Sequence, residues 1–199
     1  MTAMPQRIAV SHMFGALAVT LVGAAEFLHY REIAGGPGAV KMVALGFETL
    51  FGALTITGSF MAFGKLQGII PGRPITFPGQ KIVNAAIFLG ALGLYVALVL
   101  TQSGGSAGDA GVVMFAAMTL LALVIGVTLV LPIGGADMPV VVSLLNSYAG
   151  LAASATGFAI GNNILIVAGA LDGASGFILS ILMSKAMNRS FANVLFGAF

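Results

Sequence analysis

Cysteine is absent from the 199 residues, and charged residues make up only 7% of them. Without cysteine the chain can form no disulfide, no thiolate metal site and no haem attachment of the CxxCH type. Ordinary soluble domains contain roughly 25% charged residues. The low charge, a hydrophobic fraction of 59% and a mean hydropathy of +1.08 therefore indicate a membrane protein. The fingerprints GxGxxG and GxxxxGK(S/T) are also absent, so we expect no soluble nucleotide domain in this chain.

Six apolar runs are long enough to cross a hydrocarbon core, which takes about 20 helical residues. They cover approximately 8–28, 42–63, 82–100, 111–131, 139–160 and 164–184. Clusters of glycine, proline and serine at 35–38, 71–79 and 103–106 separate the first four runs. The sequence therefore predicts an all-α membrane protein, a polytopic bundle of six transmembrane helices forming one domain over 1–199.

The few basic residues indicate the orientation of this bundle. Six spans permit both termini to lie on the cytoplasmic or matrix side, and the positive-inside rule favours that arrangement. Six basic residues would then lie inside and two outside: Arg7, Lys65, Arg73, Lys81, Lys185 and Arg189 against Arg31 and Lys41. The amino end lacks the features of a cleaved signal peptide, so we expect the first run to be a retained helix.

Small and polar residues recur at helical spacing in four of the runs. In the fifth and sixth runs this face includes two GxxxG pairs, which allow close helix packing. Its members are Ser143, Asn146, Gly150, Ala153, Gly157 and Gly161 in the fifth run, and Gly169, Gly173, Gly176 and Ser180 in the sixth. The first and second runs carry similar faces, whereas the third and fourth are apolar all round. We therefore expect the first, second, fifth and sixth helices to form the core, with the other two facing lipid.

Three polar side chains within the runs are candidates for a proton pathway. His12 titrates near physiological pH, Asn146 can both donate and accept a hydrogen bond, and Glu48 could carry a proton as a neutral acid. Intramembrane ionisable groups are functional candidates by default. Each also has a structural interpretation: His12 and Asn146 as hydrogen-bonded links between helices, and Glu48 as a partner of Lys41 or of a backbone donor.

Two further acidic residues lie in or beside the last two runs. Asp137 follows Gly134-Gly135-Ala136 and precedes Pro139, where it could cap the fifth helix. Asp172 lies in the middle of the sixth run. Asn162 and Asn163 lie at the junction between the two helices. Nothing in the sequence decides whether the Asp172 charge is used or neutralised.

The amino-acid sequence of the last two runs is specific enough to indicate a protein family. The stretch GGADMPVVVSLLNSYAGLAASATGFAIGNNILIVAGALDGASGFILSILMSKAMNRS closely resembles the membrane part of the β-chain of proton-translocating nicotinamide nucleotide transhydrogenase, and so does the opening MTAMPQRIAVSHMFGALAVTLVGA. The resemblance covers essentially the whole chain and is weakest around the second run. It implies a membrane domain that couples proton translocation to hydride transfer from NADH to NADP⁺.

The resemblance also implies roles for particular residues. His12 matches the intramembrane histidine considered central to proton transfer, and Asn146 matches a functionally sensitive asparagine in the LNSY motif. Asp137 matches the acidic loop residue, in GGADMP, thought to help communicate with the nucleotide domains. Gly134-Gly135 and the carboxyl tail, 187–199, are the segments best placed to transmit the nucleotide state, since both should face the cytoplasmic side. Glu48 has no secure match, and Asp172 is a departure, because an uncharged residue is expected in that segment.

By the same resemblance, this chain itself should bind no cofactor or metal and contain no catalytic residue. NAD(H) and NADP(H) should bind to partner domains. Further transmembrane spans, both nucleotide-binding domains and the lipid bilayer are the expected partners, with a homodimeric assembly, no nucleic acid, and a bacterial or mitochondrial inner membrane as the location. Two alternatives from other classes are a proton-coupled transporter of a small solute and a structural membrane anchor.

Overall fold

A computed structural model of the chain describes residues 4–31, 36–102 and 108–196. These residues form six long helices, each long and apolar enough to cross a membrane: α1 (Met4–Arg31), α2 (Ala39–Leu66), α3 (Gln80–Gln102), α4 (Asp109–Val130), α5 (Met138–Ile160) and α6 (Asn163–Ala186). A 3-10 turn, η1 (Gly135–Asp137), precedes α5, and a short helix, α7 (Phe191–Phe196), follows α6. The predicted all-α fold with six membrane helices is confirmed, and the chain is an integral membrane protein.

The observed helices follow the apolar runs closely. Five of the predicted runs lie inside the observed helices, and the fourth extends past the end of α4 by one residue, Leu131. The cluster at 71–79 forms the connection between α2 and α3, whereas residue 35 of the first cluster and all of 103–106 lie outside the described residues.

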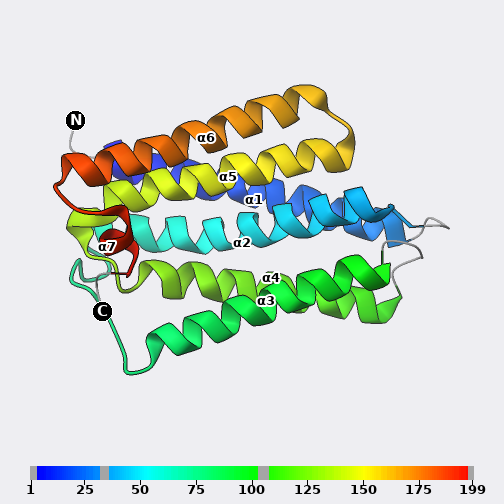
Figure 1. Cartoon of the computed structure of the whole chain (residues 1–199), viewed down its shortest axis with the longest axis horizontal. Helices are drawn as coiled ribbons and strands as arrows, with labels where there is room; N and C mark the ends of the chain where they lie inside the picture. Colours follow the sequence, from blue (N-terminus) through cyan, green and yellow to red (C-terminus); the bar gives the residue numbers. More distant parts are fainter. Residues whose placement is uncertain (1–3, 32–35, 103–107, 197–199) are drawn as a thin grey trace.

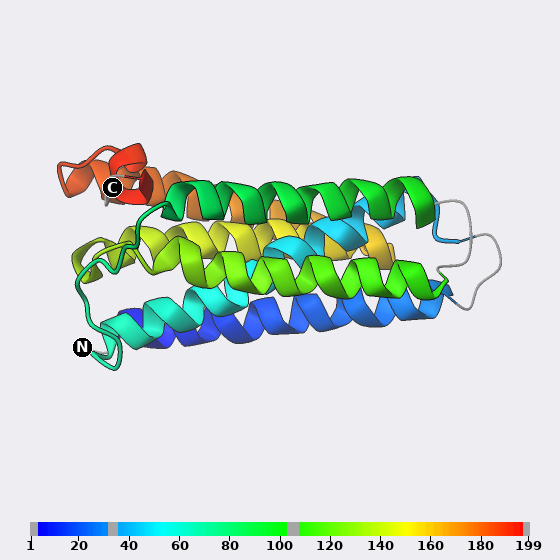
Figure 2. The same cartoon turned by 90° about the horizontal axis from the view of Figure 1, so that it is seen from below.

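Successive helices run up and down the bundle, so α1 begins at the end where α6 finishes (Figures 1 and 2). The connection between α4 and α5 and the helix α7 lie at this same end, which we call the amino end. The side of the membrane that it faces remains a prediction from the basic residues.

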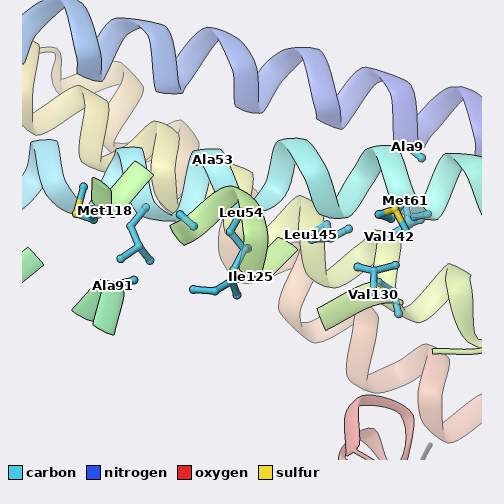
Figure 3. Packing of buried hydrophobic residues seen from close by; sticks show 14 of the residues in the cluster. Ala9, Ala53, Leu54, Met61, Ala91, Met118, Ile125, Val130, Val142 and Leu145 are labelled. Carbon is cyan, nitrogen blue, oxygen red and sulfur yellow. The ribbon is translucent and has the colours of Figure 1, made fainter. Parts of the chain in front are cut away.

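The centre of the bundle is formed by α2 and α5, in which most residues of the apolar window are buried. The expected core of four helices is therefore partly wrong, because fewer than a third of the window residues in α1 and α6 are buried. Each of those two helices packs through one face and leaves the other uncovered. The helix α4 also enters the core, where Ile125 lies in the same apolar cluster as Leu54 of α2 and Leu145 of α5 (Figure 3).

Lys65 fixes the amino end of the core. It is buried near the end of α2, and its Nζ donates hydrogen bonds to the carbonyl oxygens of Val130 (3.2 Å), Leu131 (2.5 Å) and Ile133 (2.7 Å). Carbonyl groups at a helix C-terminus have no partner within the helix and carry partial negative charge. The buried ammonium therefore satisfies the end of α4 and holds the start of the α4–α5 connection in place.

Candidate functional site

The interface between α5 and α6 is built from small residues at close approach. A Cβ atom added at any of five glycines would fall within 3.0 Å of the partner helix: Gly150, Gly157, Gly169, Gly173 and Gly176. Three serine hydroxyls of α5 donate to carbonyl oxygens of α6, from Ser143 to Gly176 (2.9 Å), Ser147 to Gly173 (2.7 Å) and Ser154 to Ile166 (2.9 Å). These contacts fix the register of the antiparallel pair.

Gly161 is an exception to the predicted packing glycines. It caps the C-terminus of α5 with a φ of 71°, and no atom lies within 4 Å of its Cβ position. This left-handed backbone favours glycine at the end of a helix. Asn162 follows as the N-cap of α6, where its side-chain oxygen accepts hydrogen bonds from the backbone N–H of Ile164 and of Leu165, both at 3.1 Å. Asn163 is the first residue of α6.

His12 of α1 and Asn146 of α5 line one cavity of about 400 Å³. Both side chains lie eight residues into helices that begin at the amino end, so they occupy similar depths. Ser143 is the other polar residue of this wall, and the remaining lining is apolar, from Met4, Pro5, Ile8, Pro139, Val142, Leu179 and Met183. The Nδ1 atom of His12 is buried and has no hydrogen-bond partner among the described residues.

Asp172 of α6 is linked through Asn146 to the cavity that His12 lines. The Asn146 amide donates a hydrogen bond from Nδ2 to the Asp172 carboxylate oxygen Oδ1 at 3.2 Å. The Asp172 side chain itself lies on an exposed part of α6. Gly176 lies beneath the same amide, because a Cβ atom there would be 2.9 Å from Asn146 Nδ2. Three helices thus bring an imidazole, an amide and a carboxylate together.

Glu48 lies in a different part of the bundle and is completely buried. Its carboxyl packs against the backbone of Gly23 in α1, and Thr156 of α5 lies beside it. The Thr156 hydroxyl donates to its own helix at Ala152 (3.1 Å), and neither Glu48 oxygen has a hydrogen-bond partner among the described residues. The predicted structural pairing with Lys41 is absent from the described contacts, where Lys41 Nζ donates to the Tyr30 hydroxyl at 2.7 Å.

The two candidate sites are separated along the length of the bundle. Gly23, which contacts Glu48, lies eleven residues beyond His12 on α1, or roughly 16 Å at 1.5 Å per helical residue. Buried hydroxyl groups lie on the neighbouring turns of α1 and α2, from Thr20, Thr55 and Ser59. The Ser59 hydroxyl has no hydrogen-bond partner among the described residues.

A second cavity, of about 500 Å³, lies at the amino end beneath the α4–α5 connection. Gly134, Gly135 and Asp137 line it together with Arg189, and the Asp137 carboxylate forms an ion pair with the Arg189 guanidinium. Asp137 occupies the N-cap position of α5, but its side chain makes no capping hydrogen bond. Gly135 donates its backbone N–H to the Gly72 carbonyl oxygen at 2.7 Å, which ties the α2–α3 connection to the same cavity.

Sequence reasoning missed two of these relationships. The sequence predicts Arg189 as a topological charge within a carboxyl tail that could transmit the nucleotide state, but it does not predict the ion pair with Asp137, which joins residues 52 positions apart. Asp172 could have been placed at the α5 interface, because it lies three residues after Gly169 and four before Gly176 on the small-residue face. Within the described residues, no three His, Asp or Glu side chains gather as a metal site would require.

Comparison with known proteins places these sites in context. The sequence model of the family described as NAD(P) transhydrogenase beta subunit matches residues 1–199. Two curated relatives named NAD(P) transhydrogenase subunit beta, one from Rhodospirillum rubrum and one from a designated strain of that species, are each 44% identical over 203 aligned positions. The alignment covers all of this chain and 42% of each relative, so the chain spans less than half the length of the proteins that it resembles.

Proposed function

This chain belongs to the NAD(P) transhydrogenase beta-subunit family, and from that premise we propose that it is the proton-conducting membrane domain of such an enzyme. Proton movement through the bundle is coupled to hydride transfer from NADH to NADP⁺. The hydride transfer takes place on partner domains that bind NAD(H) and NADP(H), and this chain binds neither nucleotide.

The observation that carries the proposal is the cavity shared by His12 and Asn146. An imidazole can take up and release a proton near neutral pH, and an amide can orient that imidazole or a water molecule. A buried ring nitrogen without a protein partner is costly, so Nδ1 of His12 is a suitable position for a proton or a hydrogen-bonded water. His12 is therefore the group that exchanges protons with the amino end.

Glu48 extends the path toward the opposite end. Glu48 is fully buried in the central helix α2. This position suits a carboxylic acid that is neutral while it carries a proton and is ionised only briefly, between releasing one proton and binding the next. The hydroxyl groups of Thr20, Thr55 and Ser59 on the intervening turns supply further hydrogen-bonding positions. Coupling requires that His12 connect alternately to the two sides, with the nucleotide state biasing the two arrangements.

The amino-end cavity is the contact with the nucleotide domains. Asp137, Gly134 and Gly135 line it, and the ion pair with Arg189 connects this loop to the chain that leaves α6. A shift of that loop would reach the start of α5 directly, and Asn146 lies about two turns further along the same helix. One proton crossing 100 mV releases about 2.3 kcal/mol, enough to bias a coupled redox equilibrium by nearly two orders of magnitude.

The remaining assembly follows from the same premise. Further membrane spans and both nucleotide-binding domains complete the enzyme, which forms a homodimer in a bacterial or mitochondrial inner membrane, with both termini of this chain on the cytoplasmic or matrix side. The transporter and anchor alternatives gain no support. The six spans are continuous helices over the described residues, without the broken helix pair typical of many secondary transporters.

The test uses proteoliposomes that contain the complete transhydrogenase complex. Hydride transfer between NADPH and an NAD⁺ analogue is recorded together with the internal pH. We expect nucleotide turnover to move protons in the wild type and in His29→Ala, because His29 is exposed near the opposite end of α1. His12→Ala should abolish proton movement while the complex stays assembled. Equal proton movement in both histidine variants would refute the proposed path.

A further inference from the structure

Asp172 is an acidic residue near the middle of a membrane helix, and the proton path described above does not use it. A charged side chain at mid-span costs about 2.5–3.5 kcal/mol on insertion scales, so it is retained where it has a partner. The carboxylate contacts the small-residue face of α5, where its Oδ2 lies against Gly150, since a Cβ atom there would be 2.9 Å away. It is therefore directed toward the helix that carries Asn146.

We propose that Asp172 is a positioning residue for proton transfer, which orients the Asn146 amide and supplies the negative charge against which His12 carries its proton. The inference rests on the proposed function of His12. It stands on the 3.2 Å hydrogen bond from Asn146 Nδ2 to Asp172 Oδ1 and on the cavity that Asn146 shares with His12.

The hydrogen bond fixes the orientation of the amide. Because Asn146 Nδ2 donates to Asp172, the amide oxygen is left on the other side of the group as an acceptor. An acceptor beside the His12 cavity can hold a protonated ring nitrogen or a water molecule that donates to it. Gly176 leaves room for the amide in this orientation. Asp172 therefore determines which atom of Asn146 faces the cavity.

The carboxylate also supplies a negative charge one residue away from the cavity wall, through Asn146. At membrane depth, away from water, an opposite charge stabilises an imidazolium far more than it does in water. The charged residues of the helices around His12 are Arg7, Glu26 and Arg31 on its own helix α1, Lys41, Glu48 and Lys65 on α2, and Asp172 and Lys185 on α6, whereas α5 has none; Glu26 lies fourteen residues from His12, or roughly 21 Å along α1. Glu48 lies about 16 Å further along the bundle, and Lys65 is occupied by the carbonyl groups at the end of α4. Asp172 is the carboxylate placed to balance a proton on His12.

The experiment follows the protonation of His12 in the complete complex. His12 and His29 are the only histidines of this chain, so labelling the chain with ¹⁵N-histidine yields ring-nitrogen signals from two imidazoles, which His29→Gln assigns. The variants are Asp172→Asn, which keeps an acceptor for Asn146 but removes the charge, Asp172→Ala as a second neutral form, and Asp172→Glu as the conservative form. Asp109→Asn at the far end of the bundle is the matched control.

At a pH where wild-type His12 is partly protonated, we expect both neutral variants to lower its imidazolium share at least roughly threefold. Proton pumping should fall with it, Asp172→Glu should restore both readouts in part, and the His29 signal should stay constant. An unchanged His12 signal in the neutral variants would overturn the inference.

The two proposals can fail separately. If His12→Ala stops pumping but the neutral Asp172 variants change neither readout, the inference falls and the proposed function stands. If His12→Ala still pumps although Asp172→Asn alters the His12 signal, the proposed function is wrong. Asp172 then has no role in proton transfer either, because that role depends on His12.

Discussion

The Asp137 carboxylate and the Arg189 guanidinium form an ion pair that ties the start of α5 to the segment after α6. The Arg189 side chain is 54% exposed, whereas that of Asp137 is only 10% exposed. A pair with one partner this exposed contributes little to stability, about 0–1 kcal/mol. Its importance in our account is mechanical, because it joins two segments at the proposed contact with the nucleotide domains.

Breaking this pair should uncouple the enzyme without unfolding it. We expect Arg189→Ala and Asp137→Asn each to lower the number of protons pumped per hydride by about threefold to tenfold, with little change in thermal stability. The exchanged pair, Asp137→Arg with Arg189→Asp, should recover part of the loss. Lys185→Ala, at the same end, is the control and should pump normally. Wild-type coupling in both single variants would remove the ion pair from the coupling route.

The α5–α6 interface should tolerate no side chain at Gly169. A Cβ atom there meets backbone atoms of α5, including the Gly150 carbonyl oxygen at 2.7 Å, so the helices must separate. We expect Gly169→Ala to destabilise the complex by about 1–3 kcal/mol, the usual effect of overpacking, as measured by thermal unfolding in detergent.

Gly93→Ala provides the matched control for this substitution. Gly93 lies in α3 with no atom within 4 Å of its Cβ position, so alanine there should be neutral or stabilising by up to about 1 kcal/mol. Equal stability of the two variants would show that close approach at Gly169 is unnecessary.

Lys65 should be essential for stability rather than for proton movement. Replacement by methionine keeps most of the side-chain volume but leaves three carbonyl oxygens at the end of α4 without their shared donor. The carbonyl oxygens of Val130 and Leu131 keep backbone donors, from Ile133 and Ile75, so the loss falls chiefly on the Ile133 carbonyl, and an unsatisfied buried group costs about 1–3 kcal/mol. We therefore expect Lys65→Met to lower the unfolding temperature substantially, whereas Lys185→Met, on the exposed surface of α6, should not. A normal unfolding temperature for Lys65→Met would contradict this assignment.

Glu48→Gln should separate proton carriage from packing. The amide has nearly the same shape, and the carboxyl oxygens have no hydrogen-bond partner to lose among the described residues. We expect a folded complex whose proton pumping falls by roughly a hundredfold, the scale of losing a proton-transferring side chain. Pumping and unfolding temperature are measured on the same preparation. If Glu48→Gln pumps normally, the path bypasses α2.

The sequence predicts the helices well because the period and length of the apolar runs depend on local composition alone. It also predicts that α5 and α6 pack through glycine, since the small residues recur at helical spacing. It does not predict that α1 and α6 are peripheral, because an uncovered apolar face and a buried one have the same composition in a membrane protein.

The candidate site is predictable as a set of residues but not as an arrangement. His12, Asn146 and Asp137 are conspicuous in the sequence because polar groups are rare there. The link from Asn146 to Asp172 depends on the register of two helices, and the pairing of Asp137 with Arg189 depends on the path of the chain after α6. Both are tertiary relationships that residue spacing does not encode.

In the proposed mechanism, His12 carries the protons that drive hydride transfer. The most direct measurement imposes a proton-motive force on proteoliposomes of the complete complex and follows NADPH formation from NADH and NADP⁺. We predict that the force accelerates this reaction in the wild type and in His29→Asn but has no effect in His12→Asn, where the imidazole is replaced by a group that does not titrate. A His12→Asn complex that responds to the force as the wild type does would contradict the account.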